Sequence, residues 1–116
     1  MNIQYTIKDI NQHNITQEDF EYFLKNNFPE YKKHGMIKFL DHSLSRSYEV
    51  IEQVNNNGTP ESKNLGRVNL QYRPDETVLS VSSRDADGLI AKLMSKNTVV
   101  INWTEKKEHY KHQYNR

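Results

Sequence analysis

The stretch from Arg67 to Ser82 places the tightest constraint on the fold of this 116-residue chain. Every second residue from Val68 to Tyr72 is apolar or aromatic, which is the period of a strand with one buried face. Pro74-Asp75-Glu76 then supplies turn-forming residues, and apolar residues resume at Val78. We therefore expect a β-hairpin here, and with it an antiparallel sheet.

Two helices are predicted on either side of this hairpin. Thr16 is followed three residues later by an acid, which is the spacing of a capping box, and apolar residues then recur every three or four positions. The first helix is expected from about Gln17 to Asn27. Asp85 or Asp87 can cap a second helix, whose apolar stripe ends near Asn97.

Three further segments complete the pattern. Apolar and polar residues alternate from Ile3 to Ile7, which predicts an opening strand. The run from Thr98 to Trp103 is rich in β-branched residues and predicts a buried strand. Between Asn55 and Gly66 the chain contains Asn, Gly and Pro in quantity, so we expect an exposed loop that is open to proteolysis.

The stretch from Met36 to Val54 supports two interpretations. Its apolar residues step by three or four positions, as on a long amphipathic helix. The rival interpretation divides it into two strands, because aromatic and β-branched residues are frequent, but the adjacent apolar pairs Phe39-Leu40 and Val50-Ile51 break the alternation. We favour the helix.

The predicted fold class is therefore α+β. A small antiparallel sheet, made of an N-terminal strand, the central hairpin and a C-terminal strand, is expected to pack against two or three helices. The length favours one hydrophobic core, so residues 1–103 are expected to form a single domain. Residues 104–116 would form a basic and aromatic C-terminal tail that could be helical.

Composition excludes several classes of function. The chain has no cysteine, so disulfides, thiolate metal sites and a cysteine nucleophile are ruled out. No apolar run has the length of a signal-peptide core or a membrane helix, so we expect a cytoplasmic protein with no membrane partner. An abundance of Asn, Lys and Ile points to a bacterial or phage gene.

Acidic residues and histidines offer three weak signs of chemistry. His109 and His112 could share a helix face, but two ligands are too few for a zinc site. The sequence Asp85-Ala86-Asp87-Gly88 resembles the start of a calcium loop, yet Lys96 occupies the position that needs a bidentate glutamate. Helix capping explains these aspartates better.

The third sign is an acid beside an imidazole at Asp41-His42, with serines nearby. No glycine-flanked nucleophile accompanies it, and the four glycines stand singly, so neither a hydrolase site nor a phosphate loop is indicated. We expect no enzyme activity, no metal and no cofactor.

The tail alternates cations with aromatic rings, a combination that can hold phosphates while stacking on bases. A second basic cluster around Lys32 to Lys38 could extend a positive face. The candidate contacts with a protein or nucleic-acid partner are Lys32, Lys33, Lys38, Trp103, Lys106, Lys107, Tyr110, Lys111, Tyr114 and Arg116.

Two functions follow from these observations. The leading hypothesis is a small non-enzymatic intracellular protein that binds another protein, of the accessory, inhibitor or immunity type. Its seven tyrosines and one tryptophan suit interface anchors. The alternative is a small nucleic-acid-binding domain that uses the tail, although the net charge of +1 is low for that role.

Overall fold

The computed structural model describes residues 4–96 and 99–104. Within these residues, six strands and two helices follow one another along the chain. They are β1 (Gln4–Asp9), α1 (Gln17–Asn27), β2 (Lys32–Lys38), β3 (Leu44–Asn56), β4 (Thr59–Tyr72), β5 (Thr77–Ser82), α2 (Ala86–Met94) and β6 (Val99–Thr104).

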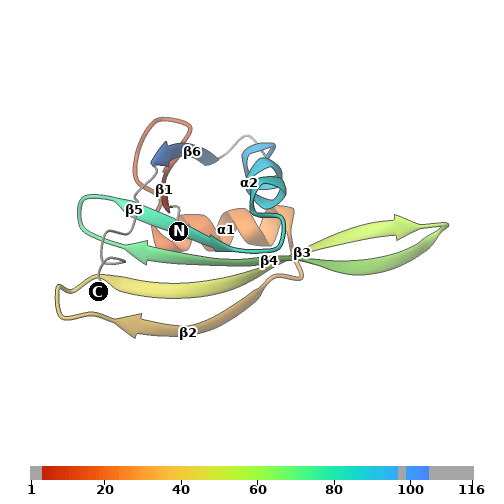
Figure 1. The fold of residues 1–116 in the computed structure, drawn as a ribbon, viewed down its shortest axis with the longest axis horizontal. Coiled ribbons are helices and arrows are strands. Elements are labelled where there is room, and N and C mark those ends of the chain that lie inside the picture. Colours follow the sequence, from red (N-terminus) through yellow and green to blue (C-terminus); the bar gives the residue numbers. More distant parts are fainter. Residues whose placement is uncertain (1–3, 97–98, 105–116) are drawn as a thin grey trace, which may run out of the picture.

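All six strands belong to one antiparallel sheet with the order β2-β3-β4-β5-β1-β6 (Figure 1). Strand β1 lies between β5 and β6, so the first and last strands of the described residues pair with each other. Strands β2 and β6 form its edges.

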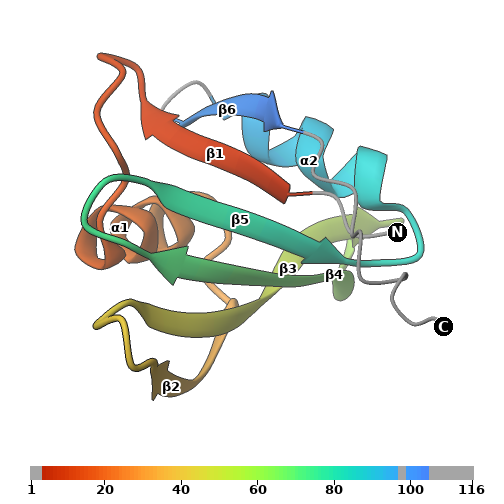
Figure 2. The same cartoon turned by 60° about the vertical axis from the view of Figure 1, so that its left-hand side comes forward.

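Both helices cover the same face of the sheet (Figure 2). Phe20 and Leu24 of α1 and Leu89 and Leu93 of α2 belong to the same buried cluster as the inward-facing residues of the strands. The ring centre of Phe20 lies 5.3 Å from that of Tyr48 on β3. One core therefore lies between this inner face and the two helices.

Both helix starts agree with the local capping signals. The Thr16 hydroxyl accepts the Asp19 N–H at 3.1 Å and the Asp19 carboxylate accepts the Thr16 N–H at 3.3 Å, so the capping box is confirmed. Asp85 caps α2 by accepting the Gly88 N–H at 2.9 Å. This helix ends at Met94, short of the predicted end.

The predicted hairpin and the predicted opening and closing strands are also confirmed. The β4–β5 hairpin pairs from Arg67 with Ser82 to Tyr72 with Thr77. β1 and β6 lie where the opening and closing strands were expected, and they pair with each other. Residues 105–116 lie outside the described residues, so the division into a domain and a tail stays a prediction.

The predicted sheet packed against two or three helices is wrong in its proportions, because strands dominate and only two short helices are described. The favoured helix from Met36 to Val54 is absent. That stretch contains the end of β2, a turn and most of β3. Tyr48 and Val50 are fully buried on the inner face, whereas Ser47 and Glu49 point to the outer face.

A β-bulge interrupts the pairing of β3 with β4. Val50 pairs with Gly66 and Ile51 pairs with Asn64, so Leu65 is an extra residue on β4. Opposite the bulge, Val50 and Ile51 are both buried, and they are the adjacent apolar pair that had counted against a strand.

The loop expected between Asn55 and Gly66 is mostly strand. β3 and β4 continue as a two-stranded ribbon that projects from the body, and we call residues 51–64 the arm (Figure 1). Only Asn57 and Gly58 form the turn, with φ of 54° and 83°. These positive angles fit a tight hairpin turn whose twist matches the strands.

Side chains from both helical regions brace the base of the arm. Glu30, after α1, accepts hydrogen bonds from Gln53 at 2.6 Å and from Ser62, two residues paired across the ribbon. Lys92 of α2 lies 2.8 Å from Glu52. Since adjacent strand residues point to opposite faces, the ribbon is held on both faces.

Candidate functional site

The structure separates the sequence-predicted site residues. Lys32, Lys33 and Lys38 lie on β2, at one edge of the sheet, while Trp103 lies on β6, at the other edge. The described residues therefore do not join the Lys32–Lys38 cluster to the start of the tail. The remaining predicted contacts lie outside the described residues, namely Lys106, Lys107, Tyr110, Lys111, Tyr114 and Arg116.

The three lysines of β2 do not form one basic face. Lys33 points to the inner face, where its Nζ lies 3.3 Å from the Glu21 carboxylate of α1. Lys32 pairs in register with Glu49, on the outer face. An acid therefore accompanies each of these two lysines.

Exposed apolar side chains gather at the other end of β2. Seven large apolar residues are exposed in the described part of the chain, and four of them fall within residues 36–40. Ile37 is 58% exposed, Phe39 is 43% exposed and Leu40 is fully exposed. We call this group, Met36, Ile37, Phe39 and Leu40, the apolar patch.

The turn that carries the patch is held in a defined shape. The Phe39 N–H donates to the Ser43 carbonyl at 2.9 Å, and the His42 N–H donates to the Phe39 carbonyl at 3.0 Å. The Asp41 carboxylate accepts both the hydroxyl and the N–H of Ser43, at 2.6 and 3.0 Å, and these bonds lower the pKa of Asp41. The patch is therefore presented on a preformed turn.

These contacts also bear on the hydrolase sign at Asp41-His42. The Asp41 carboxylate accepts the Ser43 hydroxyl directly, so the His42 imidazole does not lie between these two side chains as it would in a triad. His42 has a φ of 69°, an uncommon angle for a residue other than glycine, which places it in the turn. The acid and serine therefore stabilise the turn.

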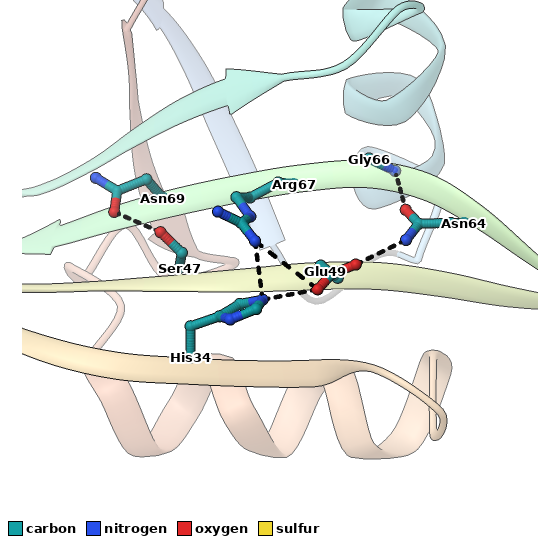
Figure 3. Close-up of polar contacts among 7 residues, drawn as sticks. All are labelled: His34, Ser47, Glu49, Asn64, Gly66, Arg67 and Asn69. Carbon is teal, nitrogen blue, oxygen red and sulfur yellow. Dashed lines mark hydrogen bonds and ion pairs between the residues drawn. The ribbon is translucent and has the colours of Figure 1, made fainter.

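A polar cluster occupies the outer face near the other end of β2 (Figure 3). His34 Nε2 lies 2.7 Å from the Glu49 carboxylate and 3.2 Å from Arg67 Nη2. The Asn64 amide donates to the second Glu49 oxygen at 2.9 Å. The hydrogen bond from His34, and then that from Asn64, lower the pKa of Glu49.

This cluster joins strands β2, β3 and β4. Asn64 also accepts the Gly66 N–H at 2.8 Å, which fixes the backbone beside the bulge. Ser47, the hydroxyl before Glu49 on the same face, donates to Asn69 at 3.0 Å (Figure 3). Among the described residues, no group of three or more His, Asp or Glu side chains could hold a metal ion.

A second polar network lies under α1. The Tyr48 hydroxyl donates to Glu21 at 3.0 Å and lies 2.9 Å from the Tyr72 hydroxyl. Burial raises the pKa of both tyrosines. Partial burial acts to raise the pKa of Glu21, but three hydrogen bonds outweigh it and lower that pKa. This network fixes α1 on the sheet.

A cleft of about 450 Å³ lies where the arm leaves the body. The base of the arm forms one wall, and α2 with the residues before it forms the other. Lys92 and Glu52, one from each wall, pair with each other at 2.8 Å. The charged residues Lys63, Arg84 and Asp85 also line this cleft.

No protein-family model, curated protein or solved structure matches this chain. No helix in the described part of the chain is long and apolar enough to cross a membrane. The function must therefore be inferred from the surface itself.

The apolar patch was missed because Ile37 and Leu40 fit the apolar stripe of the helix expected from Met36 to Val54. A signal for the turn was present in Asp41-His42-Ser43, whose acid and serine are typical turn formers. Given that turn, Phe39 and Leu40 would fall at the end of a hairpin, where side chains are exposed.

Proposed function

We propose that this protein acts in the cytoplasm by binding another protein through the apolar patch. The single observation that supports this function is the exposure of four large apolar side chains within residues 36–40. Exposed apolar groups that lie together are typical of interaction sites, whereas scattered ones are ordinary.

The shape of the turn supports the same function. Its hydrogen bonds are formed before any partner arrives, so little conformational entropy is lost on binding. Phe39 and Leu40 can then fill a pocket on the partner without a rearrangement of the chain. An interaction of this kind suits an accessory, inhibitor or immunity protein.

A capture experiment with matched variants tests this function. The full chain is immobilised and exposed to a lysate of the organism that expresses the gene. Leu40→Asp places a charge in the apolar patch, whereas Tyr22→Asp places one at an exposed aromatic residue of α1. We expect one protein to be captured by the unchanged chain and by Tyr22→Asp, and to be lost with Leu40→Asp.

The captured protein is then purified and titrated against the same three chains, and one partner per chain is expected. Capture that survives Leu40→Asp would contradict the proposed site. Capture that disappears when the lysate is treated with nuclease would instead support the nucleic-acid alternative.

A further inference from the structure

Strand β2 has a hydrogen-bonded neighbour on one side only. It pairs with β3 and is the first strand in the sheet order of the described residues. Its other side is a free edge, which is where a strand from another molecule can be added.

The direction of each backbone group on this edge follows from one hydrogen bond. The Phe39 N–H donates to the carbonyl of Ser43, the residue opposite, so Phe39 and Ser43 form a hydrogen-bonded pair at the start of the turn. Such pairs alternate along an antiparallel ladder, so Ile37 also bonds to β3. The N–H and C=O groups of Met36 and Lys38 therefore point to the free edge.

The two halves of β2 differ as docking surfaces. The pairing with β3 is irregular between Lys33 and Met36, and irregular edges resist strand addition. From Met36 to Lys38, the end of β2, the ladder is regular and the apolar patch begins. Residues 36–38 are therefore the part of the edge that suits an added strand, and Phe39 and Leu40 follow them in the turn.

Charge identifies the kind of segment that fits. The chain contains no acid between Glu30 and Asp41. Glu49 and Glu21 lie beside Lys32 and Lys33, whereas Lys38 forms no ion pair among the described residues. A partner strand that carries acidic and apolar side chains would complement Lys38 and the apolar patch. A second copy of β2 would bring two strands of like charge together, which is unfavourable. The segment after residue 104 is also basic.

We infer that the free edge at residues 36–38 accepts an extended, acidic and apolar segment of another protein as an added strand, with Phe39 and Leu40 beside it. This inference rests on the proposed function, because it names how the partner binds and what its binding segment contains. Backbone hydrogen bonds to Met36 and Lys38 would supply affinity, and the side chains of the patch would supply specificity.

The test uses a labelled eight-residue peptide of alternating glutamate and valine, with a peptide of alternating lysine and valine as its control. Binding to the full chain is measured by fluorescence anisotropy at several salt concentrations. We expect the glutamate peptide to bind at least about tenfold more tightly than the lysine peptide, and to weaken as salt rises.

Two substitutions of Lys38 distinguish the contribution of its backbone N–H to peptide binding from that of its charge. Lys38→Pro removes an N–H that points to the free edge and leaves the ladder with β3 intact. Lys38→Gln removes the charge alone. We expect about a tenfold further loss of affinity with Lys38→Pro relative to Lys38→Gln, with circular dichroism spectra unchanged.

Met36→Pro provides a second backbone variant if Lys38→Pro does not fold. A glutamate peptide with N-methyl groups on alternate residues needs no variant at all, and we expect it not to bind. Equal affinities for Lys38→Pro and Lys38→Gln, binding of the methylated peptide, or no binding of the glutamate peptide would each overturn the added strand.

Sedimentation of the chain alone tests whether a second copy of the chain occupies the free edge of β2. A dimer that dissociates with Lys38→Pro would show that a second copy fills the edge, and would overturn the inference. If the peptide tests fail while Leu40→Asp still abolishes capture, the proposed function stands and only the added strand falls.

Discussion

Strand β3 leads into a hairpin connection at each end, and the two connections differ in their chemistry. The end toward β2 carries the apolar patch on a turn held by Asp41. The end toward β4 is the arm, whose turn at Asn57 and Gly58 is flanked by polar residues. Both connections are exposed, so exposure alone does not explain the apolar residues.

This difference indicates which of the two projections binds a partner. The arm is stabilised within the chain, because its strands pair with each other and Glu30 and Lys92 contact its base. The apolar patch leaves its side chains in water, at a cost of about 25 cal/mol per Å² of apolar surface. A bound protein would remove that cost.

The largest expected effect comes from charging the two projections in turn. The double change Phe39→Asp and Leu40→Asp should lower the affinity for the captured protein by about a hundredfold, because two apolar side chains lose their contacts. Val54→Asp in the arm should leave affinity unchanged. Titration calorimetry with each variant measures both, and an equal loss from the arm variant would remove the distinction.

The helix starts and the β4–β5 hairpin could be predicted because their signals are local. The capping box needs only Thr16 and Asp19, and the β4–β5 hairpin needs only alternation and a turn. The same rule would have predicted the arm, because Asn57-Gly58 is a strong hairpin signal. It was outweighed by the density of polar residues around it.

The region from residue 36 to residue 54 depended on non-local contacts instead. Strand β3 lies between β2 and β4, and its register with β4 shifts at the Leu65 bulge. Neither partner can be identified from the residues of β3 alone. The apolar patch was hidden for the same reason, because an apolar residue in an assumed helix is read as buried.

The arm's turn offers a second, smaller effect. Gly58 has a φ of 83° and no neighbour within 4 Å of an added Cβ, so Gly58→Ala should cost about 1 kcal/mol through backbone strain alone. Gly35→Ala on β2, which also meets nothing within 4 Å and has no such φ, is the control. Thermal unfolding should show a lower midpoint only for Gly58→Ala.

The bracing of the arm gives a third test. Glu30→Ala removes the acceptor for Gln53 and Ser62, and should cost about 0.5 kcal/mol because these bonds are exposed. Amide exchange should accelerate within residues 51–64 and stay unchanged at residues 36–40. A loss of protection spread evenly over the sheet would mean that Glu30 supports the whole fold.

The smallest expected effect is on the stability of the fold at acidic pH. The pKa of Asp41 is lowered by its hydrogen bonds from Ser43, so its contribution is present above the pKa of the unfolded chain and is lost as pH falls through the lowered value. Asp41→Asn should therefore flatten the acid limb of stability against pH. Denaturant titrations between pH 2 and pH 7, which span the ~3.9 reference value, measure this.

The most direct test of the contrast is a nuclear magnetic resonance titration of the labelled full chain with the captured protein. We predict that amide signals of residues 36–40 shift and that the Met36 and Lys38 amides become protected from exchange, while those of residues 54–61 do not change. Shifts confined to the arm, with residues 36–40 unaffected, would contradict the account.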